Sequence, residues 1–156
     1  MRFAATALAV ILMSAAAGAH AQSEAQNPAA FMAQNAKADG VTVLPSGVEY
    51  KVLKPGPGTS RHPTPADYVT INYEGRLLDG KVFDSTYKTD PAGDSVTYQL
   101  KTLIPGWVDV VQQMREGDEW LVWVPPSLGY GAKQVGAIPP NSVLVFRLKL
   151  ESILGG

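Results

Sequence analysis

The chain has 156 residues, of which 13 are basic and 14 acidic, so its formal net charge at pH 7 is −1. A charge this close to neutral gives no electrostatic reason to expect nucleic acid or an anionic membrane as a partner. The chain contains no cysteine and two histidines. This composition excludes disulfide bonds and a lipid-modified cysteine, and we expect no metal site.

The first 21 residues are predicted to be a secretory signal peptide. Arg2 supplies a positive charge, residues 4–17 are almost wholly apolar, and Ala19, His20 and Ala21 form the small-x-small pattern of a cleavage site. The apolar stretch is shorter than the roughly 20 residues that a membrane-spanning helix needs. We therefore expect cleavage after Ala21 and no stable membrane association afterwards, with an uncleaved anchor as the alternative.

Residues 22–40 are predicted to be an N-terminal arm or linker. They are rich in Ala, Gln and Asn, and Phe31 and Met32 are their sizeable apolar side chains. A short helix over residues 29–39, ended by Gly40, is expected to be ordered only if something packs on these two side chains. The folded domain is expected to span residues 41–156.

Alternation of apolar and polar residues predicts several short strands beyond residue 40. Two are expected at residues 41–43 and 48–52, around a turn at residues 45–47. A longer strand over residues 69–77 leads through Asp79 and Gly80, a dipeptide that favours a hairpin turn, into a partner strand at residues 81–84.

One amphipathic helix is predicted in the second half of the chain. Pro105 suits the start of a helix and Gly117 its C-terminal cap. Apolar residues at i, i+3, i+4 and i+7 form a single stripe between them: Trp107, Val110, Val111 and Met114.

The remaining segments are a predicted loop at residues 85–95, a short strand at residues 96–100, and an apolar, central strand at residues 120–124. A long ordered loop over residues 125–142 and a closing strand over residues 144–151 follow. Some six short strands and one helix predict an α+β fold, in which a twisted antiparallel β-sheet wraps around the amphipathic α-helix.

Five motifs in this part of the chain together resemble the FKBP family of peptidyl-prolyl cis-trans isomerases. They are VTINYEG at residues 69–75, LDGKVFDS at 78–85, IPGW at 104–107, LGYGA at 128–132 and IPPNSVLVF at 138–146. The resemblance covers residues 41–154. The runs NAKADGV at residues 35–41 and LPSGVEY at 44–50 further resemble the secreted bacterial branch that carries an N-terminal arm.

The resemblance implies an FKBP-like fold with a substrate pocket between helix and sheet. Trp107 would form the floor under the substrate proline ring. Asp84 would lie at the rim, and Tyr130 would donate a hydrogen bond to the bound peptide from a flap loop. These three are the expected catalytic residues, in the sense of positioning and polarising groups. The implied substrate-binding residues are Tyr73, Phe83, Leu103, Ile104, Trp107, Tyr130, Ile138 and Phe146.

Each of these residues has a plainer interpretation when the resemblance is set aside. Trp107, Tyr73 and Phe146 would be core residues, and Asp84 would be a solvated acid in a turn. The sequence also departs from the family at Val96, where an aromatic is common, with Tyr98 two residues further on. This change is expected to remove part of one wall and to affect the preference for the residue before proline.

By resemblance, the chain is expected to be a peptidyl-prolyl cis-trans isomerase (EC 5.2.1.8 class) that needs no cofactor and no metal. Its expected partners are unfolded polypeptides that contain X-Pro bonds, and macrolide inhibitors of the family. We expect a monomer in the periplasm. A chaperone or binding module that uses the same cleft without catalysis is the first alternative, and a secreted ligand-binding domain is the second.

Overall fold

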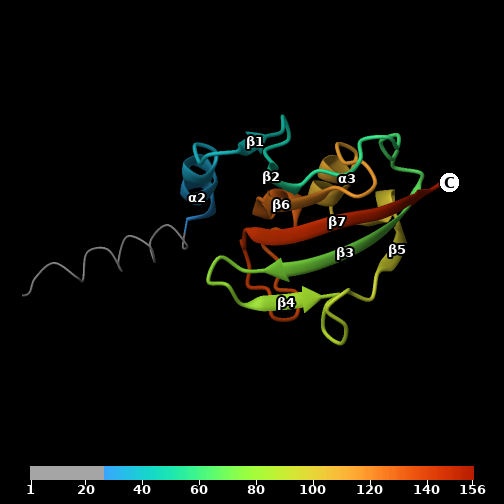
Figure 1. Ribbon diagram of the computed structural model, residues 1–156. Coiled ribbons are helices and arrows are strands. Elements are labelled where there is room, and N and C mark those ends of the chain that lie inside the picture. The colour runs from blue at the N-terminus through green and yellow to red at the C-terminus, as the bar shows by residue number, and fades with distance from the viewer. Residues whose placement is uncertain (1–26) are drawn as a thin grey trace, which may run out of the picture.

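The computed structural model of the chain describes residues 27–156, so the predicted signal peptide and the start of the predicted arm lie outside the described residues. These residues form a sheet of 7 strands in the order β1-β2-β6-β7-β3-β4, with β5 also paired to β3 (Figure 1). The elements are α2 (Pro28–Asn35), β1 (Val41–Val43), β2 (Glu49–Lys54), β3 (Tyr68–Arg76), β4 (Val82–Ser85), β5 (Val96–Gln99), η1 (Leu100–Thr102), α3 (Pro105–Val111), β6 (Glu119–Val124), η2 (Pro126–Leu128) and β7 (Leu144–Leu154).

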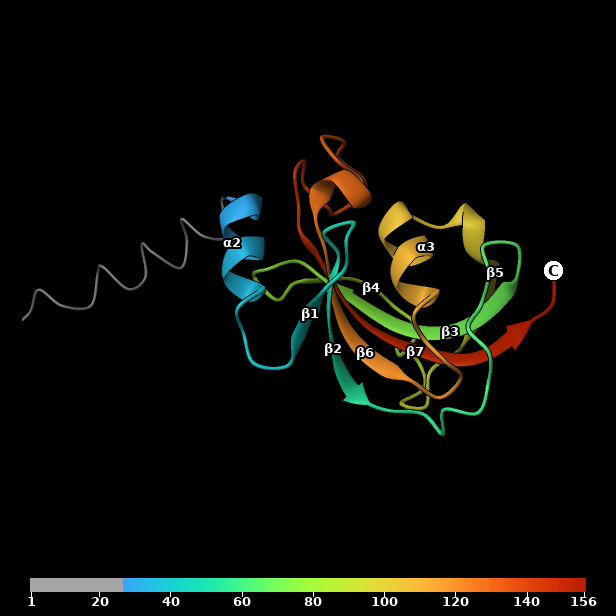
Figure 2. The same cartoon turned by 90° about the horizontal axis from the view of Figure 1, so that it is seen from above.

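The sheet curves around α3, which lies in its concave face (Figure 2). Trp107, Val110 and Val111 of α3 are buried in one core with inward residues of the strands, among them Ile71 and Val122. Every strand pairing is antiparallel. The predicted α+β fold, with an antiparallel sheet wrapped around one amphipathic helix, is confirmed.

The helix itself is shorter than the apolar stripe predicted. α3 ends at Val111, and the amides of Gln113 and Met114 then bond to carbonyls three residues back, which is a tighter turn than an α-helix. Met114 is nevertheless buried, with 1% of its surface exposed. The stripe therefore marks the buried face correctly but overstates the length of the α-helix.

Gly117 does not cap α3, contrary to the prediction. Its φ is +86°, and its N–H donates to the carbonyl of Leu150 at 2.7 Å. Asp118 beside it accepts from Arg115 N–H at 2.8 Å and from Gly56 N–H at 2.7 Å. The bonds to Leu150 and Gly56, which are distant in sequence, and the local bond from Arg115 compete with continuation of the helix. Gly117 serves the turn into β6.

Helix α2, in the predicted arm, ends earlier than predicted. The side chain of Asn27 caps α2 by accepting from Ala30 N–H at 3.1 Å, and the helix ends at Asn35 instead of continuing to residue 39. Met32 is buried, and Asn35 Nδ2 donates to Glu49 Oε2 on β2 at 2.7 Å. These contacts hold α2 beside the start of the sheet. None of the helices within residues 27–156 has the length and apolar character needed to cross a membrane.

Strand β3 uses one edge for two different partners. Gly75 lies opposite Asp84 of β4, whereas Val69 and Ile71 lie opposite Tyr98 and Val96 of β5. Residues 86–95 connect β4 to β5. The loop was predicted to begin at residue 85, but Ser85 still belongs to β4 and pairs with Glu74 of β3. This arrangement brings Tyr73, at the change of partner, close to Asp84.

Candidate active site

An aromatic cavity of about 260 Å³ lies between α3 and the sheet. Its lining residues come from β3, β4, β5, β7, α3 and the loops that precede α3 and follow η2: Tyr73, Phe83, Asp84, Tyr98, Leu103, Ile104, Trp107, Tyr130 and Phe146. All the predicted site residues except Ile138 are in this set. Ile138 lines an adjoining hollow of about 250 Å³, which shares Phe83, Asp84 and Tyr130 with the cavity.

Trp107 occupies the first turn of α3, two residues after Pro105 begins the helix. A Cβ on the intervening Gly106 would lie 2.6 Å from Val124 Cγ1, so only glycine lets the helix approach β6 this closely. The indole is 5% exposed and meets Tyr73 and Phe146 in edge-to-face contacts, with ring centroids 5.1 and 5.0 Å apart. Three aromatic rings from different elements therefore meet at the inner end of the cavity.

The Nε1 atom of Trp107 is buried and has no hydrogen-bond partner among the described residues. The same is true of Nε1 of Trp120, which stacks on Tyr50 with ring centroids 4.1 Å apart. Because Trp120 does not line the cavity, an unpaired indole is not peculiar to it. Burial without a hydrogen-bond partner is thus common to both indoles and does not distinguish Trp107.

Gly75 of β3 makes room for two of the aromatic walls. A Cβ at this position would lie 2.5 Å from Phe83 Cζ and 2.8 Å from Phe146 Cε1. The two phenyl rings meet edge to face, with centroids 5.7 Å apart. Phe83 and Phe146 thus pack directly over the backbone of β3, and the absence of a side chain at residue 75 sets their position.

The polar part of the rim is a tyrosine and a carboxylate in contact. The hydroxyl of Tyr73 donates to Asp84 Oδ2, while Oδ1 accepts from Ser85 N–H at 2.9 Å and from Lys88 Nζ at 3.0 Å. The bond from Tyr73 is the main cause that lowers the pKa of Asp84, and burial opposes it. Burial and the neighbouring Asp84 raise the pKa of Tyr73. At neutral pH the pair is a charged carboxylate and a neutral phenol.

Tyr98 is a lining residue that sequence reasoning did not assign. It is opposite Val69 of β3 on the face that carries the core, and it is 40% exposed at the cavity. Val96, expected to leave a gap in this wall, packs against the core instead. The residue of β5 that lines the cavity is thus the aromatic Tyr98. The period of two along β5 was the available signal, since residues 96 and 98 share a face.

Two hydrogen-bond donors at the cavity are free. Tyr130 is 38% exposed, and neither its hydroxyl nor the backbone N–H of Ile104 has a partner among residues 27–156. The loop that carries Tyr130 is held by Gly131, whose N–H donates to Pro126 O at 2.8 Å and whose carbonyl accepts from Asn141 N–H at 2.8 Å. A ligand in the cavity can therefore meet the hydroxyl of Tyr130 on a loop that these bonds hold in place, and Ile104 carries a second unpaired donor.

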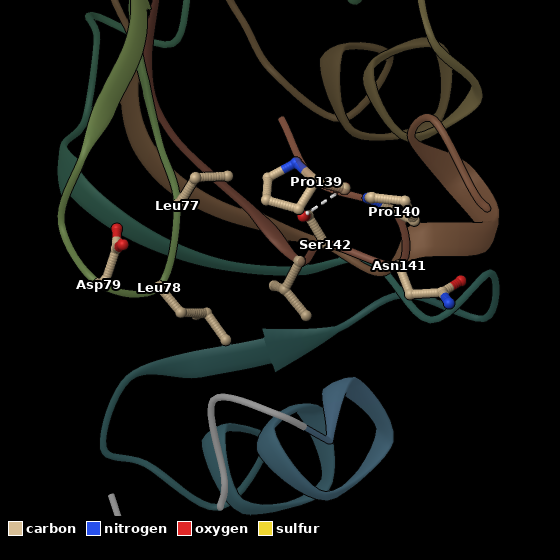
Figure 3. Close-up of a pocket in the computed structure, with 8 residues that line it drawn as sticks. Leu77, Leu78, Asp79, Pro139, Pro140, Asn141 and Ser142 are labelled. Atoms are coloured by element: carbon tan, nitrogen blue, oxygen red, sulfur yellow. Dashed lines mark hydrogen bonds between the residues drawn. The ribbon is translucent and has the colours of Figure 1, made fainter. Parts of the chain in front are cut away.

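A second hollow, of about 400 Å³, lies between the β3–β4 turn and residues 139–143 (Figure 3). Leu77, Leu78 and Asp79 line one side and the two prolines at 139 and 140 the other, where Ser142 Oγ donates to Pro139 O at 2.7 Å. It is larger than the aromatic cavity, but no aromatic side chain lines it and Asp79 is its charged group. Size therefore does not identify the reactive site here.

Within residues 27–156, no three His, Asp or Glu side chains are placed to share a metal ion. What the cavity offers is an apolar, shape-defining interior with a carboxylate and hydrogen-bond donors at its edge. Such a site suits catalysis through desolvation and selective binding of a distorted substrate.

Comparison with known proteins identifies the family. The sequence matches the FKBP-type peptidyl-prolyl cis-trans isomerase family over residues 59–151, and the domain amino terminal to FKBP-type peptidyl-prolyl isomerase over residues 4–52. The chain belongs to the family of FKBP-type peptidyl-prolyl cis-trans isomerases.

Individual relatives agree with this assignment. Peptidyl-prolyl cis-trans isomerase Mip of Coxiella burnetii is 44% identical over 130 residues, which are 83% of this chain and 54% of the relative. Outer membrane protein MIP of Legionella longbeachae is 44% identical over 125 residues, 80% of this chain and 52% of that protein. The chain thus spans about half the length of these relatives.

A solved structure agrees with the fold. The crystal structure of a peptidyl-prolyl cis-trans isomerase from Pseudomonas syringae pv. tomato superimposes with a TM-score of 0.74 at 30% identity, covering 85% of this chain and 95% of that one. The fold described above is therefore shared with a crystallised family member.

Proposed function

We propose that this chain is a peptidyl-prolyl cis-trans isomerase that accelerates rotation about X-Pro bonds in exported proteins as they fold. The observation that carries the proposal is the aromatic cavity with Asp84 and Tyr130 at its rim, in a chain of this family. Its dimensions, about 260 Å³, suit a proline ring and its flanking peptide groups better than a large cofactor.

The reaction requires little beyond such a cavity. An X-Pro bond prefers trans by only about 0.5–1 kcal/mol, yet the barrier between the isomers is roughly 20 kcal/mol because the amide must lose its resonance. The twisted transition state has less charge separation than the planar amide, so an apolar interior binds it relatively better than water does. Lowering the barrier by about 7–8 kcal/mol corresponds to five to six orders of magnitude in rate.

The proposed roles follow from where each side chain lies. Trp107 lies under the proline ring, between the walls that Tyr73 and Phe146 form. The free hydroxyl of Tyr130 and the free N–H of Ile104 hold the peptide carbonyls and orient the bond for rotation. No covalent intermediate and no proton transfer takes part.

The same proposal assigns Phe83, Leu103 and Ile138 to substrate binding and Asp84 to polarisation of the rim. Phe83 and Leu103 line the cavity itself, and Ile138 lines the adjoining hollow. Asp84 holds Tyr73 through its hydrogen bond and leaves a negative charge beside the mouth. Macrolide inhibitors of the family are expected to compete for this cavity.

We further propose export to the periplasm. The support is the pattern of residues 1–21 and the similarity to a protein named as an outer membrane protein. The proposed division is a signal peptide over residues 1–21 with cleavage after Ala21, an arm over residues 22–40 and the isomerase domain over residues 41–156. The processed protein is proposed to act as a monomer.

The test is catalysed cis-to-trans isomerisation of Ala-X-Pro-Phe tetrapeptides by the processed protein, beside the Asp84→Val and Tyr130→Phe variants. We expect substantial catalysis by the wild type and a fall of about tenfold or more in both variants, since each loses a polar contact at the rim. A folded wild type that is no faster than the uncatalysed reaction, yet suppresses aggregation of unfolded clients, would favour the chaperone alternative instead.

A further inference from the structure

Thr86 lies where β3 changes its partner strand. Pairing with β4 ends at Glu74 and Ser85, and pairing with β5 begins at Ile71 and Val96. Asn72 and Tyr73 therefore face neither strand across this edge. Thr86, the first residue of the loop after β4, occupies the place between the two pairings.

The hydroxyl of Thr86 replaces a backbone carbonyl as the acceptor of one hydrogen bond in the sheet. The backbone N–H of Thr86 donates to Tyr73 O at 2.9 Å, as in an ordinary β-ladder. The return bond runs from Tyr73 N–H to Thr86 Oγ at 3.0 Å. The carbonyl of Thr86 is thereby free to accept from Asp94 N–H at 2.8 Å, which closes the loop over residues 86–94.

This hydroxyl also belongs to a buried polar chain behind the rim. Thr86 and Asn72 are 8% and 3% exposed, and Thr86 Oγ donates to Asn72 Oδ1 at 2.9 Å. Asn72 Nδ2 donates in turn to Glu151 Oε1 of β7 at 2.9 Å. A Cβ at Gly93 would lie 2.5 Å from Asn72 Oδ1, so the loop closes tightly over this chain of bonds.

We propose that Thr86 is a positioning residue for the isomerase site, whose hydroxyl fixes the register at which the phenol of Tyr73 meets the carboxylate of Asp84. Asp84 lies opposite Gly75 and two residues before Thr86, so the bonds between Thr86 and Tyr73 fix both ends of that contact. The catalytic consequence depends on the proposed function. The positioning of the contact between Tyr73 and Asp84 by Thr86 does not.

The experiment compares Thr86→Val, which keeps the shape but removes the hydroxyl, with Thr86→Ser, which keeps the hydroxyl. Thr70→Val is the matched control, because Thr70 of β3, the strand to which Thr86 bonds, has a hydroxyl bond to Thr97 at 2.8 Å on the exposed side of the sheet. The exported protein is purified from cells that express the full chain. Carboxyl NMR follows the titration of Asp84, and kcat and KM are measured on Ala-Leu-Pro-Phe.

In Thr86→Val we expect the pKa of Asp84 to rise towards its ordinary value, because the bond from Tyr73 is the main cause that lowers it. We expect kcat/KM to fall by about threefold to fivefold, mostly through kcat, since a loosened rim loses contacts made in the transition state. Thr86→Ser and Thr70→Val should match the wild type in both readouts.

An unchanged Asp84 pKa in folded Thr86→Val overturns the proposal, even if the variant is less stable, since Thr86 would then be structural only. Should Thr86→Val not fold, Thr86→Ala removes the same hydroxyl with a smaller side chain and is judged by the same readouts. A wild type without isomerase activity contradicts the proposed function alone, because the Asp84 titration still tests the positioning by Thr86.

Discussion

The contact between Tyr73 and Asp84 makes the stability of the cavity rim depend on pH. The folded protein lowers the pKa of Asp84 from an ordinary value of 3.8, chiefly through the hydroxyl of Tyr73. A lowered pKa stabilises the folded state above the unfolded pKa, and this contribution is lost as the pH falls through the folded pKa. At neutral pH the contact therefore contributes its full stabilisation of the folded state.

Tyr73→Phe removes the hydroxyl and keeps the ring. We expect the pKa of Asp84 to rise and kcat/KM at pH 7 to fall about fivefold, as a contact that orders the rim is lost. The difference in unfolding free energy between wild type and variant should shrink below pH 3.8. Denaturant unfolding from pH 7 to pH 2.5 measures it, and a difference that grows in acid contradicts the assignment.

Gly75→Ala tests the packing over β3. The backbone there is not in the left-handed region, so the added methyl acts through its clash with Phe83 and Phe146. We expect a loss of about 1–3 kcal/mol in stability from overpacking. Activity should fall at least about tenfold because two walls move. Tetrapeptide kinetics and urea unfolding check this, and wild-type activity in the variant would show that these rings do not define the substrate site.

Among the helices and strands, α3 shows what the sequence could and could not predict. The stripe of Trp107, Val110, Val111 and Met114 marks the buried face, and Pro105 marks the start. Its end was predicted wrongly because the bond from Gly56 to Asp118 and the bond from Gly117 to Leu150 come from the tertiary fold. Local signals set the face of a helix, whereas contacts distant in sequence end it.

Helix α2 is expected to stabilise the domain without entering the reaction. Met32→Ala should lower the unfolding free energy by about 2 kcal/mol, the lower end of the range for a buried methionine. Asn35→Ala should lower it by about 1 kcal/mol through loss of the bond to Glu49. Neither residue lines the aromatic cavity, so tetrapeptide kcat/KM should stay within about twofold of wild type. A large loss of activity without unfolding would show that the arm acts on the site.

Across residues 27–156, one carboxylate connects segments that are far apart in sequence. Asp67 accepts from Arg61 Nη1 at 2.6 Å and from Thr64 N–H at 2.7 Å, and Gly156 N–H lies 3.4 Å from its Oδ1. The bond from Arg61 is the main cause that lowers the pKa of Asp67 well below 3.8. Asp67 thus joins the segment before β3 to the end of β7.

Asp67→Asn should make the protein less stable at pH 7, because the ionised carboxylate and its donors are lost. Because folding lowers the pKa of Asp67 from 3.8, its stabilising effect is fully present above pH 3.8 and diminishes as the pH falls further. Urea midpoints of both proteins at pH 7, 4 and 2.5 should therefore converge in acid. Curves that stay parallel would exclude a linked titration of Asp67.

The alternation of residues was enough to predict most of the sheet, the apolar stripe was enough to predict the helix, and the five motifs were enough to predict most of the cavity. Tyr98 was missed since periodicity tells which face a residue takes, but not whether it reaches the core, as Val96 does, or the cavity. Thr86 was missed for a related reason. Tyr73 and Asn72 come within bonding distance of Thr86 only because β3 pairs first with β5 and then with β4 along the same edge.

The central claim is that the aromatic cavity is where X-Pro bonds rotate, and Trp107→Leu beside Trp123→Leu tests it most directly. Trp107 lines the cavity, whereas Trp123 lies on β6 opposite Val145 and Glu49 and does not line it. Exchange NMR of Ala-Leu-Pro-Phe should show a fall of more than about tenfold in catalysis for folded Trp107→Leu and little change for Trp123→Leu. Equal activity in the two folded variants would contradict the assignment of the cavity as the active site.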